Sequence, residues 1–192
     1  MTGCGNITLA ILAAGRASRF GGRKLEAAID GVMIGTMTAA RLAGFDFSAR
    51  LVVVDPAHIA LINQFAALGF TAIANDQPDA GLSRSISLAA QAAQNSAADA
   101  LLICLADMPN IPAENITAML RAFGDAPQVI ASSVQGIAMP PALFPRAHFA
   151  RLATLSGSDG AKPMLAGAML IEADAWSMVD IDTVDDLTAF TR

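Results

Sequence analysis

The strongest concentration of positive charge in this sequence directly follows its first apolar run. Residues 11–24 have the sequence ILAAGRASRFGGRK, in which four cations fall within nine residues and no acid stands among them. The background is negative, because the chain has 12 Lys and Arg against 17 Asp and Glu. Glycine-rich backbone can turn N–H groups toward an anion, and neighbouring cations neutralise it. The stretch therefore indicates binding of a phosphate or another small anion through Arg16, Arg19, Arg23 and Lys24.

Two well-known phosphate loops do not fit these residues. A P-loop has a glycine immediately before its lysine, whereas Arg23 precedes Lys24. The dinucleotide fingerprint has three glycines after a strand, whereas Gly3 and Gly5 precede the apolar run and have no third partner. The stretch is thus a phosphate loop of another kind, unless it is a solvated Arg-rich surface loop, which charge runs commonly are.

Two acids lie in places where a carboxylate has both a chemical and a structural use. Asp107 follows the apolar run ALLICL, where it can hold Mg²⁺ together with substrate phosphates or cap the helix expected near Pro112. Asp182 lies in DIDTVDD, in which Thr183 and Asp186 have the spacing of a capping box. Asp182 is therefore either a second metal ligand or part of a helix start.

Several polar residues surround the expected start of a helix near residue 83. Ser83 or Ser85 can cap that helix, and Asn75 can be a plain turn residue. The chain has only two lysines, Lys24 and Lys162, and both fall inside candidate motifs. Lys162 is either a ligand for an anion or a surface lysine.

Short apolar runs alternate with helical patterns, which is typical of an α/β fold. Near-continuous apolar strands suit a parallel sheet that is covered on both faces. We expect strands at residues 7–12, 51–54, 71–74, 100–105 and 128–132. We expect helices at residues 33–43, 56–68, 83–94 and 112–123. In the last helix an apolar stripe is expected at Ile116, Met119, Leu120 and Phe123, and Gly124 is expected to form its C-terminal cap.

The alternation is lost after about residue 133. SVQGIAMPPALFPR contains three prolines and indicates a strand or a loop insertion, followed by a short helix at 147–155 and a late strand at 168–172. The chain has no internal repeat and no linker, so residues 1–192 are expected to form one domain. Ligands of open α/β sheets bind outside the carboxyl ends of the strands. We therefore expect the cationic loop and Asp107 at the same edge of the sheet.

The composition excludes several classes of protein. Hydrophobic residues make up 54% of the chain and the mean hydropathy is +0.50, which argues against disorder. No apolar run is long enough to span a bilayer, and the N-terminus has no signal-peptide pattern. Cys4 and Cys104 are too few for a disulfide framework. A net charge of −5 disfavours nucleic-acid binding. We expect a cytoplasmic protein with no nucleic-acid or membrane partner.

The cationic stretch also carries a family resemblance. LAAGRASRFGGRK is similar to the L-A-A-G-x-S-x-R-x-G-x-x-K signature of the MobA-like nucleotidyltransferases, and within them to the molybdenum cofactor cytidylyltransferases. Gly15, Arg19, Gly21 and Lys24 take the pattern positions, whereas the serine falls at Ser18, one place from its usual slot.

The resemblance extends over nearly the whole chain. NDQPDAGLSRSISLAAQAA, LADMPNIP, PPALFPRAHFARLATLSGSDGAKPML and VDIDTVDDL resemble successive segments of the same family. The chain departs from the family pattern at Met139, where His or Asn is usual, and at Lys162, which replaces an arginine. It also lacks the usual proline after the lysine motif. These departures concern the second-substrate pocket more than the nucleotide pocket.

The resemblance implies a single-domain, Rossmann-like three-layer sandwich with a mostly parallel central sheet, as in nucleotide-diphospho-sugar transferases. It implies transfer of CMP from CTP to the terminal phosphate of molybdopterin carrying molybdenum, with Mg²⁺ as cofactor. A molybdoenzyme or its chaperone would receive the product. The implied catalytic residues are Arg19, Lys24 and Asp107, and the implied metal ligands are Asp107 and Asp182. The implied nucleotide-binding residues are Leu12, Ala13, Ala14, Gly15, Arg19, Lys24, Asn75 and Ser83, with Lys162 at the second substrate.

The preference for cytidine rests on the second alanine of LAAG, Ala14. Guanylyltransferase relatives usually have glycine there, and a methyl group next to the base narrows the space for a purine. The alternatives are a GTP-dependent molybdopterin guanylyltransferase and a nucleotidyltransferase acting on a sugar or alditol phosphate. An alternative of another class is a non-catalytic protein that binds the cofactor and delivers it.

Overall fold

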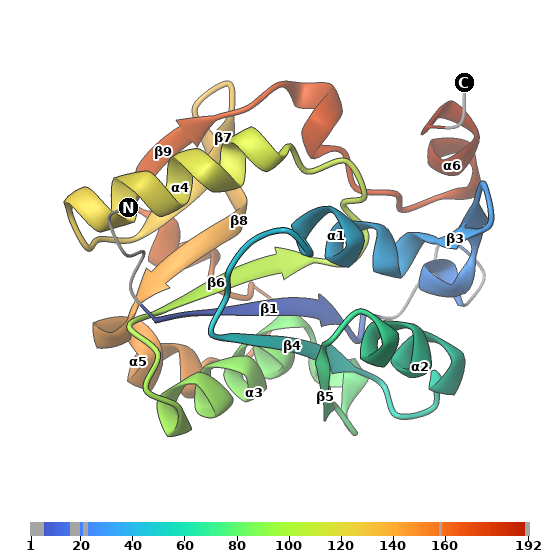
Figure 1. The fold of residues 1–192 in the computed structure, drawn as a ribbon, viewed down its shortest axis with the longest axis horizontal. Helices are drawn as coiled ribbons and strands as arrows, with labels where there is room; N and C mark the ends of the chain where they lie inside the picture. Colours follow the sequence, from blue (N-terminus) through green and yellow to red (C-terminus); the bar gives the residue numbers. More distant parts are fainter. Residues whose placement is uncertain (1–5, 16–19, 21–22, 158, 191–192) are drawn as a thin grey trace.

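Two layers of helices enclose a central β-sheet, in agreement with the predicted α/β class (Figure 1). The computed structural model describes residues 6–15, 20, 23–157 and 159–190. The strands are β1 (Ile7–Ala13), β2 (Ala28–Ile29), β3 (Val32–Met33), β4 (Ala49–Val54), β5 (Thr71–Ala74), β6 (Ala100–Leu105), β7 (Ile130–Val134), β8 (Ile137–Pro145) and β9 (Met169–Glu172). The α-helices are α1 (Ile34–Leu42), α2 (Ile59–Ala67), α3 (Leu82–Asn95), α4 (Ala113–Asp125), α5 (Phe149–Ala153) and α6 (Val184–Phe190). The 3₁₀ helices are η1 (Lys24–Glu26), η2 (Pro78–Ala80), η3 (Arg146–His148), η4 (Lys162–Leu165) and η5 (Ala175–Met178).

Within the described residues the main sheet has seven strands in the order β5-β4-β1-β6-β8-β7-β9. Every pairing in it is parallel except the two made by β8, which runs antiparallel to β6 and β7. The sheet is therefore mostly parallel, as predicted. The carboxyl ends of β1 and β6 meet at one edge, which places the loops after these strands side by side.

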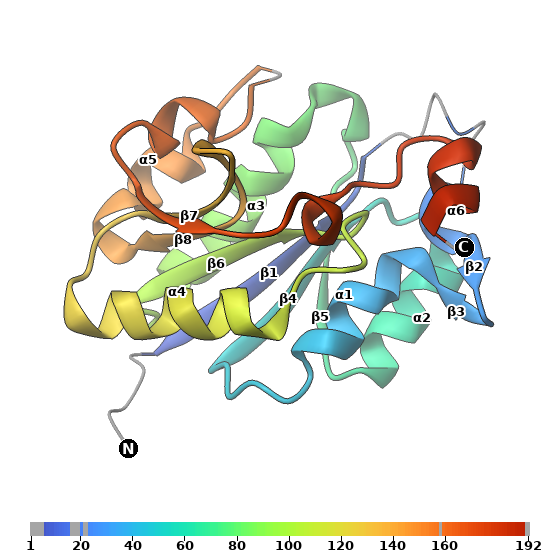
Figure 2. The same ribbon diagram turned by 90° about the horizontal axis from the view of Figure 1, so that it is seen from above.

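Alternate residues of β1 point into two separate cores, one on each face of the sheet. Ile7, Leu9 and Ile11 pack in the core that contains apolar side chains of α1, α2 and α4. Ala10 and Leu12 pack in the core that contains side chains of α3 and α5. Figure 2 shows these two helical layers on opposite sides of the strands. Because both faces are covered, the central strands must be apolar throughout, as their sequences are.

Helix α4 follows its predicted apolar stripe but not its predicted end. Ile116, Met119 and Phe123 are buried against the sheet, as the helical spacing requires. The prediction that Gly124 caps the helix is wrong, because α4 continues through Asp125. Gly124 is exposed and remains helical, and the helix ends at Ala126, whose backbone is extended.

The segment with three prolines forms β8, which inserts between β6 and β7 in the middle of the sheet. The sequence was compatible with either a strand or a loop at this segment, and the antiparallel direction of β8 was not predicted. The β2–β3 hairpin was not predicted either, and α6 was indicated only by its capping box. Among the described residues no helix is both long and apolar enough to cross a bilayer.

The C-terminal helix α6 lies beside the β2–β3 hairpin, close to the carboxyl edge of the sheet (Figures 1 and 2). A small apolar cluster joins them, in which Ile29, Ile34 and Ile181 are buried and Leu187 and Phe190 pack against them. This cluster holds the segment before α6, including Asp182, over the edge where β1 and β6 end.

A tight contact fixes η1 against α1, and we expect it to be sensitive to a single methyl group. A Cβ atom at Gly35 would lie 2.9 Å from the Leu25 Cβ and 3.1 Å from the Leu25 carbonyl oxygen. Gly35→Ala should therefore lower the free energy of unfolding, because overpacking costs about 1–3 kcal/mol. The gain in helix propensity, about 1 kcal/mol, offsets only part of it. Urea unfolding measures the change.

The matched control is Gly44→Ala, because a methyl group added at Gly44 would have no atom within 4 Å beyond its own chain neighbours. Equal stability of the Gly35→Ala and Gly44→Ala variants would contradict the close packing of η1 on α1.

Candidate functional site

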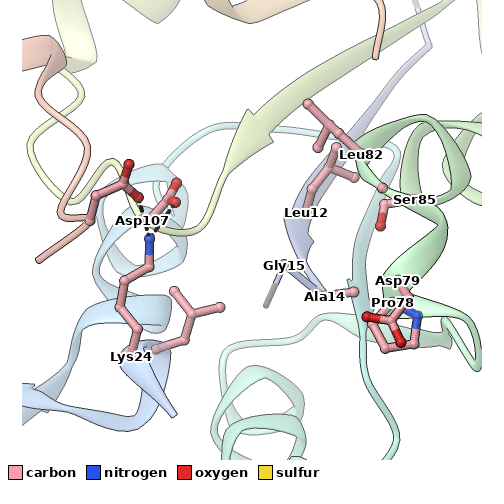
Figure 3. Close-up of a pocket in the computed structure, with 12 residues that line it drawn as sticks. Leu12, Ala14, Gly15, Lys24, Pro78, Asp79, Leu82, Ser85 and Asp107 are labelled. Atoms are coloured by element: carbon pink, nitrogen blue, oxygen red, sulfur yellow. Dashed lines mark hydrogen bonds and ion pairs between the residues drawn. The ribbon is translucent and has the colours of Figure 1, made fainter. Parts of the chain in front are cut away.

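A pocket of about 400 Å³ opens at the carboxyl ends of β1 and β6. The loop after β1, the turn η1, the loop after β6, the segment before α6 and the start of α3 all contribute to its wall. Figure 3 shows the cation and the acid on one side and the α3 segment on the other. The pocket is lined by Leu12, Ala14, Gly15, Lys24, Leu25, Pro78, Asp79, Gly81, Leu82, Ser85, Asp107 and Asp182.

Lys24 bridges two carboxylates that are far apart in the sequence. Its Nζ donates to Asp107 Oδ2 at 2.8 Å and to Asp182 Oδ1 at 3.0 Å. The Lys24 side chain is only 8% exposed. Burial by itself lowers the pKa of Lys24, but the charges and hydrogen bonds of Asp107 and Asp182 raise the pKa above its ordinary value of 10.5. The ammonium is therefore charged at neutral pH.

The turn that carries Lys24 is tied down by its neighbours. The Glu26 carboxylate lies 3.1 Å from Arg23 Nη1 and 2.8 Å from His58 Nδ1. The hydrogen bond from His58 lowers the pKa of Glu26, burial opposes this, and the Arg23 charge adds to the lowering. These contacts attach η1 to the start of α2, so the backbone of Lys24 has a defined position.

The loop of Asp107 is held from helix α1. Thr38 Oγ1 donates to the carbonyl of Met108 at 2.9 Å, and Arg41 Nε donates to the carbonyl of Pro109 at 2.7 Å. Thr38 and Arg41 were not predicted to have this role, because only the tertiary structure brings α1 to this loop. Helix α4 has no side-chain cap. Asp107 therefore does not cap α4, and its carboxylate faces the pocket instead.

The segment of Asp182 contains the predicted capping box and also supplies a carboxylate. Asp186 accepts from the Thr183 backbone N–H at 2.7 Å, and Thr183 Oγ1 accepts from the Asp186 N–H at 3.1 Å. The capping box uses the side chains of Thr183 and Asp186 and does not need that of Asp182. The Asp182 carboxylate binds Lys24 instead. The Ile181 N–H donates to the Asp107 carbonyl at 2.9 Å and joins the two acidic segments.

A further acid in this region, Asp180, was not predicted. Burial and then the negative charge of Asp182 raise its pKa, with a smaller contribution from Asp107. Asp180 is thus close enough to Asp182, Asp107 and Lys24 to interact with them electrostatically.

The acids of the pocket suit a divalent cation. Asp107 and Asp182 each place one carboxylate oxygen within 3.0 Å of the same positive charge, that of Lys24. Mg²⁺ in proteins is commonly held by one or two carboxylates together with substrate phosphates. The donor set is therefore appropriate for a hard cation that a phosphate-bearing ligand helps to bind.

The predicted nucleotide-binding residues separate into two groups. Leu12, Ala14 and Gly15 line the pocket, whereas Ala13 is buried in the core on the α1 face. Asn75 and Ser83 are completely buried and do not line it. Arg19, with its neighbour Arg16, lies outside the described residues.

Ser85, rather than Ser83, faces the pocket. Asn75 Nδ2 donates to Ser85 Oγ at 3.0 Å, and Asn75 Oδ1 accepts from the Gln77 N–H at 3.0 Å. Asn75 therefore does not line the pocket but hydrogen-bonds two parts of its wall, Ser85 and the segment that leads into η2. Neither serine caps α3, since the helix has no side-chain cap.

A second pocket of about 300 Å³ adjoins the first, and Leu82 lines both. Lys162 and Asp159 lie at this pocket, and Met139 and Pro140 of β8 contribute to its wall. Most of the remaining surface is apolar and comes from Ile86, Ile103, Leu105, Ala138, Ala142, Phe144, Ala161 and Leu165. The structure thus combines a charged pocket with a mainly apolar one.

Known proteins resemble this chain over nearly its whole length. The chain is 28% identical over 196 residues to the purine catabolism protein PucB of Bacillus subtilis (strain 168), covering 94% of each protein. A manganese complex of Rv0371c from Mycobacterium tuberculosis H37Rv has a TM-score of 0.72 at 24% identity, covering 97% of this chain and 98% of that one.

A CMP:2-keto-3-deoxy-manno-octonic acid synthetase complexed with CTP has a TM-score of 0.74 at 15% identity, covering 97% of each chain. At these identities the two structural likenesses show a shared fold. The MobA-like NTP transferase domain matches residues 9–174, which include the main sheet from the third residue of β1 onward and both pockets apart from Asp182. The chain therefore belongs to the family of MobA-like NTP transferases and is a nucleotidyltransferase of this kind.

Proposed function

We propose that the protein transfers CMP from CTP to the terminal phosphate of molybdenum-bearing molybdopterin, releasing pyrophosphate and forming the cytosine dinucleotide cofactor. The observation that carries this proposal is the pair of adjoining pockets. One has the cation and carboxylates that a triphosphate and its metal need. The other has the apolar lining that a heterocyclic body needs.

The charged pocket supports nucleotidyl transfer without a protein nucleophile. A phosphate oxygen of the acceptor attacks the α-phosphorus of CTP, the bond from that phosphorus to the bridging oxygen breaks, and pyrophosphate leaves. Two anions must approach each other, so neutralisation of charge lowers the barrier most. Lys24 and Arg19 are assigned to the triphosphate, with Gly15 providing a close approach of backbone.

Asp107 and Asp182 would hold the divalent metal, which we propose to be Mg²⁺. When bound, such an ion supplies charge neutralisation to the phosphates. The manganese complex of the structural neighbour supports a divalent metal in this fold. The protein's own contribution is the orientation of the two carboxylates by Arg41, Thr38 and the capping box before α6.

The apolar pocket favours a pterin over a sugar or alditol as acceptor. A polyol in that pocket would lose hydrogen bonds to water without protein partners to replace them, which is unfavourable. A flat pterin can pack its ring faces against the apolar wall, with its polar edge toward Lys162, Asp159 and solvent. Lys162 lies where it can pair with an anionic group of that substrate. The product would pass to a molybdoenzyme or its chaperone.

The decisive experiment is a nucleotide panel with molybdenum-loaded molybdopterin and Mg²⁺, followed by pyrophosphate release. Release from CTP that requires the loaded cofactor is expected. Faster turnover with GTP would overturn the cytidine assignment, and turnover with a sugar phosphate alone would favour the polyol acceptor. Tight binding of the cofactor with no pyrophosphate from any nucleotide would favour a delivery protein.

Base choice should respond to Ala14, whose side chain is buried at the pocket wall. Ala14→Gly removes one methyl group and should increase the ratio of GTP to CTP turnover about tenfold, since discrimination by one such group is typically about 1–3 kcal/mol. The measurement is kcat/KM for both nucleotides. An unchanged ratio would show that another residue selects the base.

A further inference from the structure

Lys24 occupies the place between the two carboxylates that a divalent cation would need. Its Nζ is within 3.0 Å of both Asp107 Oδ2 and Asp182 Oδ1, and its side chain is largely buried where η1 meets the β6 loop and the segment before α6 (Figure 3). The same oxygens cannot bind a buried ammonium and a divalent ion at once, because the two positive charges would repel at short range. The lysine and the metal therefore compete for one pair of acids.

The backbone segments that carry the two acids are anchored independently of Lys24. The segments of Asp107 and Asp182 are joined by the hydrogen bond from Ile181 N to Asp107 O, and each has its own anchor in α1 or in the capping box. Lys24 reaches them through a flexible four-carbon chain. The pocket of about 400 Å³ next to it gives the ammonium another place to go. The side chain of Lys24 is thus the part that can move.

We infer that Lys24 closes the metal site in the nucleotide-free protein, and that a nucleoside triphosphate opens it by drawing the ammonium onto its phosphates; this inference rests on the proposed triphosphate site. The protein then binds a divalent cation weakly by itself and well together with nucleotide. The coupling is reciprocal, so the metal also strengthens nucleotide binding. The metal ion and the nucleotide therefore bind cooperatively.

The test is a titration of the full-length protein with Mn²⁺ in the absence of nucleotide, with free Mn²⁺ measured by electron paramagnetic resonance. Lys24→Met removes the charge and keeps the length of the side chain. We expect this variant to bind one Mn²⁺ at least about tenfold more tightly than the wild type. If Lys24 lies between the acids in about 90% of wild-type molecules, only about a tenth of them can bind the ion, and the apparent affinity falls by that factor. The double variant Lys24→Met/Asp107→Asn should lose the gain.

The matched control is Lys162→Met, since Lys162 is the other lysine of the chain. This variant should bind Mn²⁺ with wild-type affinity. Lys24→Arg keeps a cation between the acids, so its Mn²⁺ affinity should not rise either. If Lys24→Met does not fold by circular dichroism, Lys24→Gln replaces it. Wild-type protein that binds Mn²⁺ without nucleotide as tightly as the neutral variant would overturn the inference.

This titration separates the inference from the proposed reaction. It uses no acceptor and no turnover, so a failure of the nucleotide panel does not change its outcome. Conversely, equal Mn²⁺ affinities would reject the closing role of Lys24 and leave the reaction assignment standing.

Discussion

Asp107→Asn should lower kcat for pyrophosphate release by roughly a hundredfold or more while the protein stays folded. Loss of one preorganised charged group at a transferring phosphoryl group typically has an effect of about 10²–10³ in kcat. The carboxylate of Asp107 faces the pocket and pairs with Lys24 at 2.8 Å. Its loss removes one of the two acids assigned to the metal, and the neutral amide cannot replace the charge.

The loss of stability should be moderate, so that the variant stays folded. Lys24 keeps its ion pair with Asp182, so Asp107→Asn removes one charge-assisted hydrogen bond, about 1.5–3 kcal/mol. Urea unfolding measures this, and Asp185→Asn, an exposed acid of α6, is the matched control that should keep both activity and stability. Full activity of Asp107→Asn with a large loss of stability would make Asp107 a structural residue.

Lys24→Ala is the second substitution with a large expected effect. It removes the buried ammonium from the pocket and leaves Asp107 and Asp182 without their shared cation. We expect kcat to fall by about 10²–10³, because the charge that neutralises the triphosphate is lost. Lys24→Arg should recover part of it, since the charge remains but the shape of the guanidinium differs.

The control for Lys24→Ala is Lys162→Ala. Lys162 lies in the apolar pocket, so its loss should raise the KM for the acceptor and leave the KM for CTP unchanged. Steady-state kinetics with both substrates varied separates the two roles. Equal effects of both variants on the KM for CTP would contradict the assignment of the two pockets.

Much of the architecture followed from local patterns. The predicted strands at β1, β4, β5 and β6 and the stripe of α4 are confirmed, because apolar periodicity and strand length are properties of neighbouring residues. The capping box of Thr183 and Asp186 is confirmed for the same reason. Gly124 shows the limit, since α4 runs through it to Asp125 in spite of the local end signal.

The direction of β8 required long-range information. Whether a proline-rich segment forms an edge, a loop or a central antiparallel strand depends on which strands it meets, and β6 lies more than 30 residues earlier in the chain. Likewise, Asn75 and Ser83 have the residue types of ligands, but the packing of α3 buries both and turns Ser85 to the pocket.

The sequence by itself determined the alternation of elements, the α/β class and the kinds of side chain placed after β1 and β6. Only the tertiary structure decided which of them meet. Lys24, Asp107 and Asp182 are separated by 83 and 75 residues along the chain, yet strand order and the small cluster around Ile181 bring their charged atoms within 3.0 Å of Nζ. The spacing of apolar residues reflects the structure of one element at a time, whereas a site at a sheet edge depends on how separate segments pack against one another.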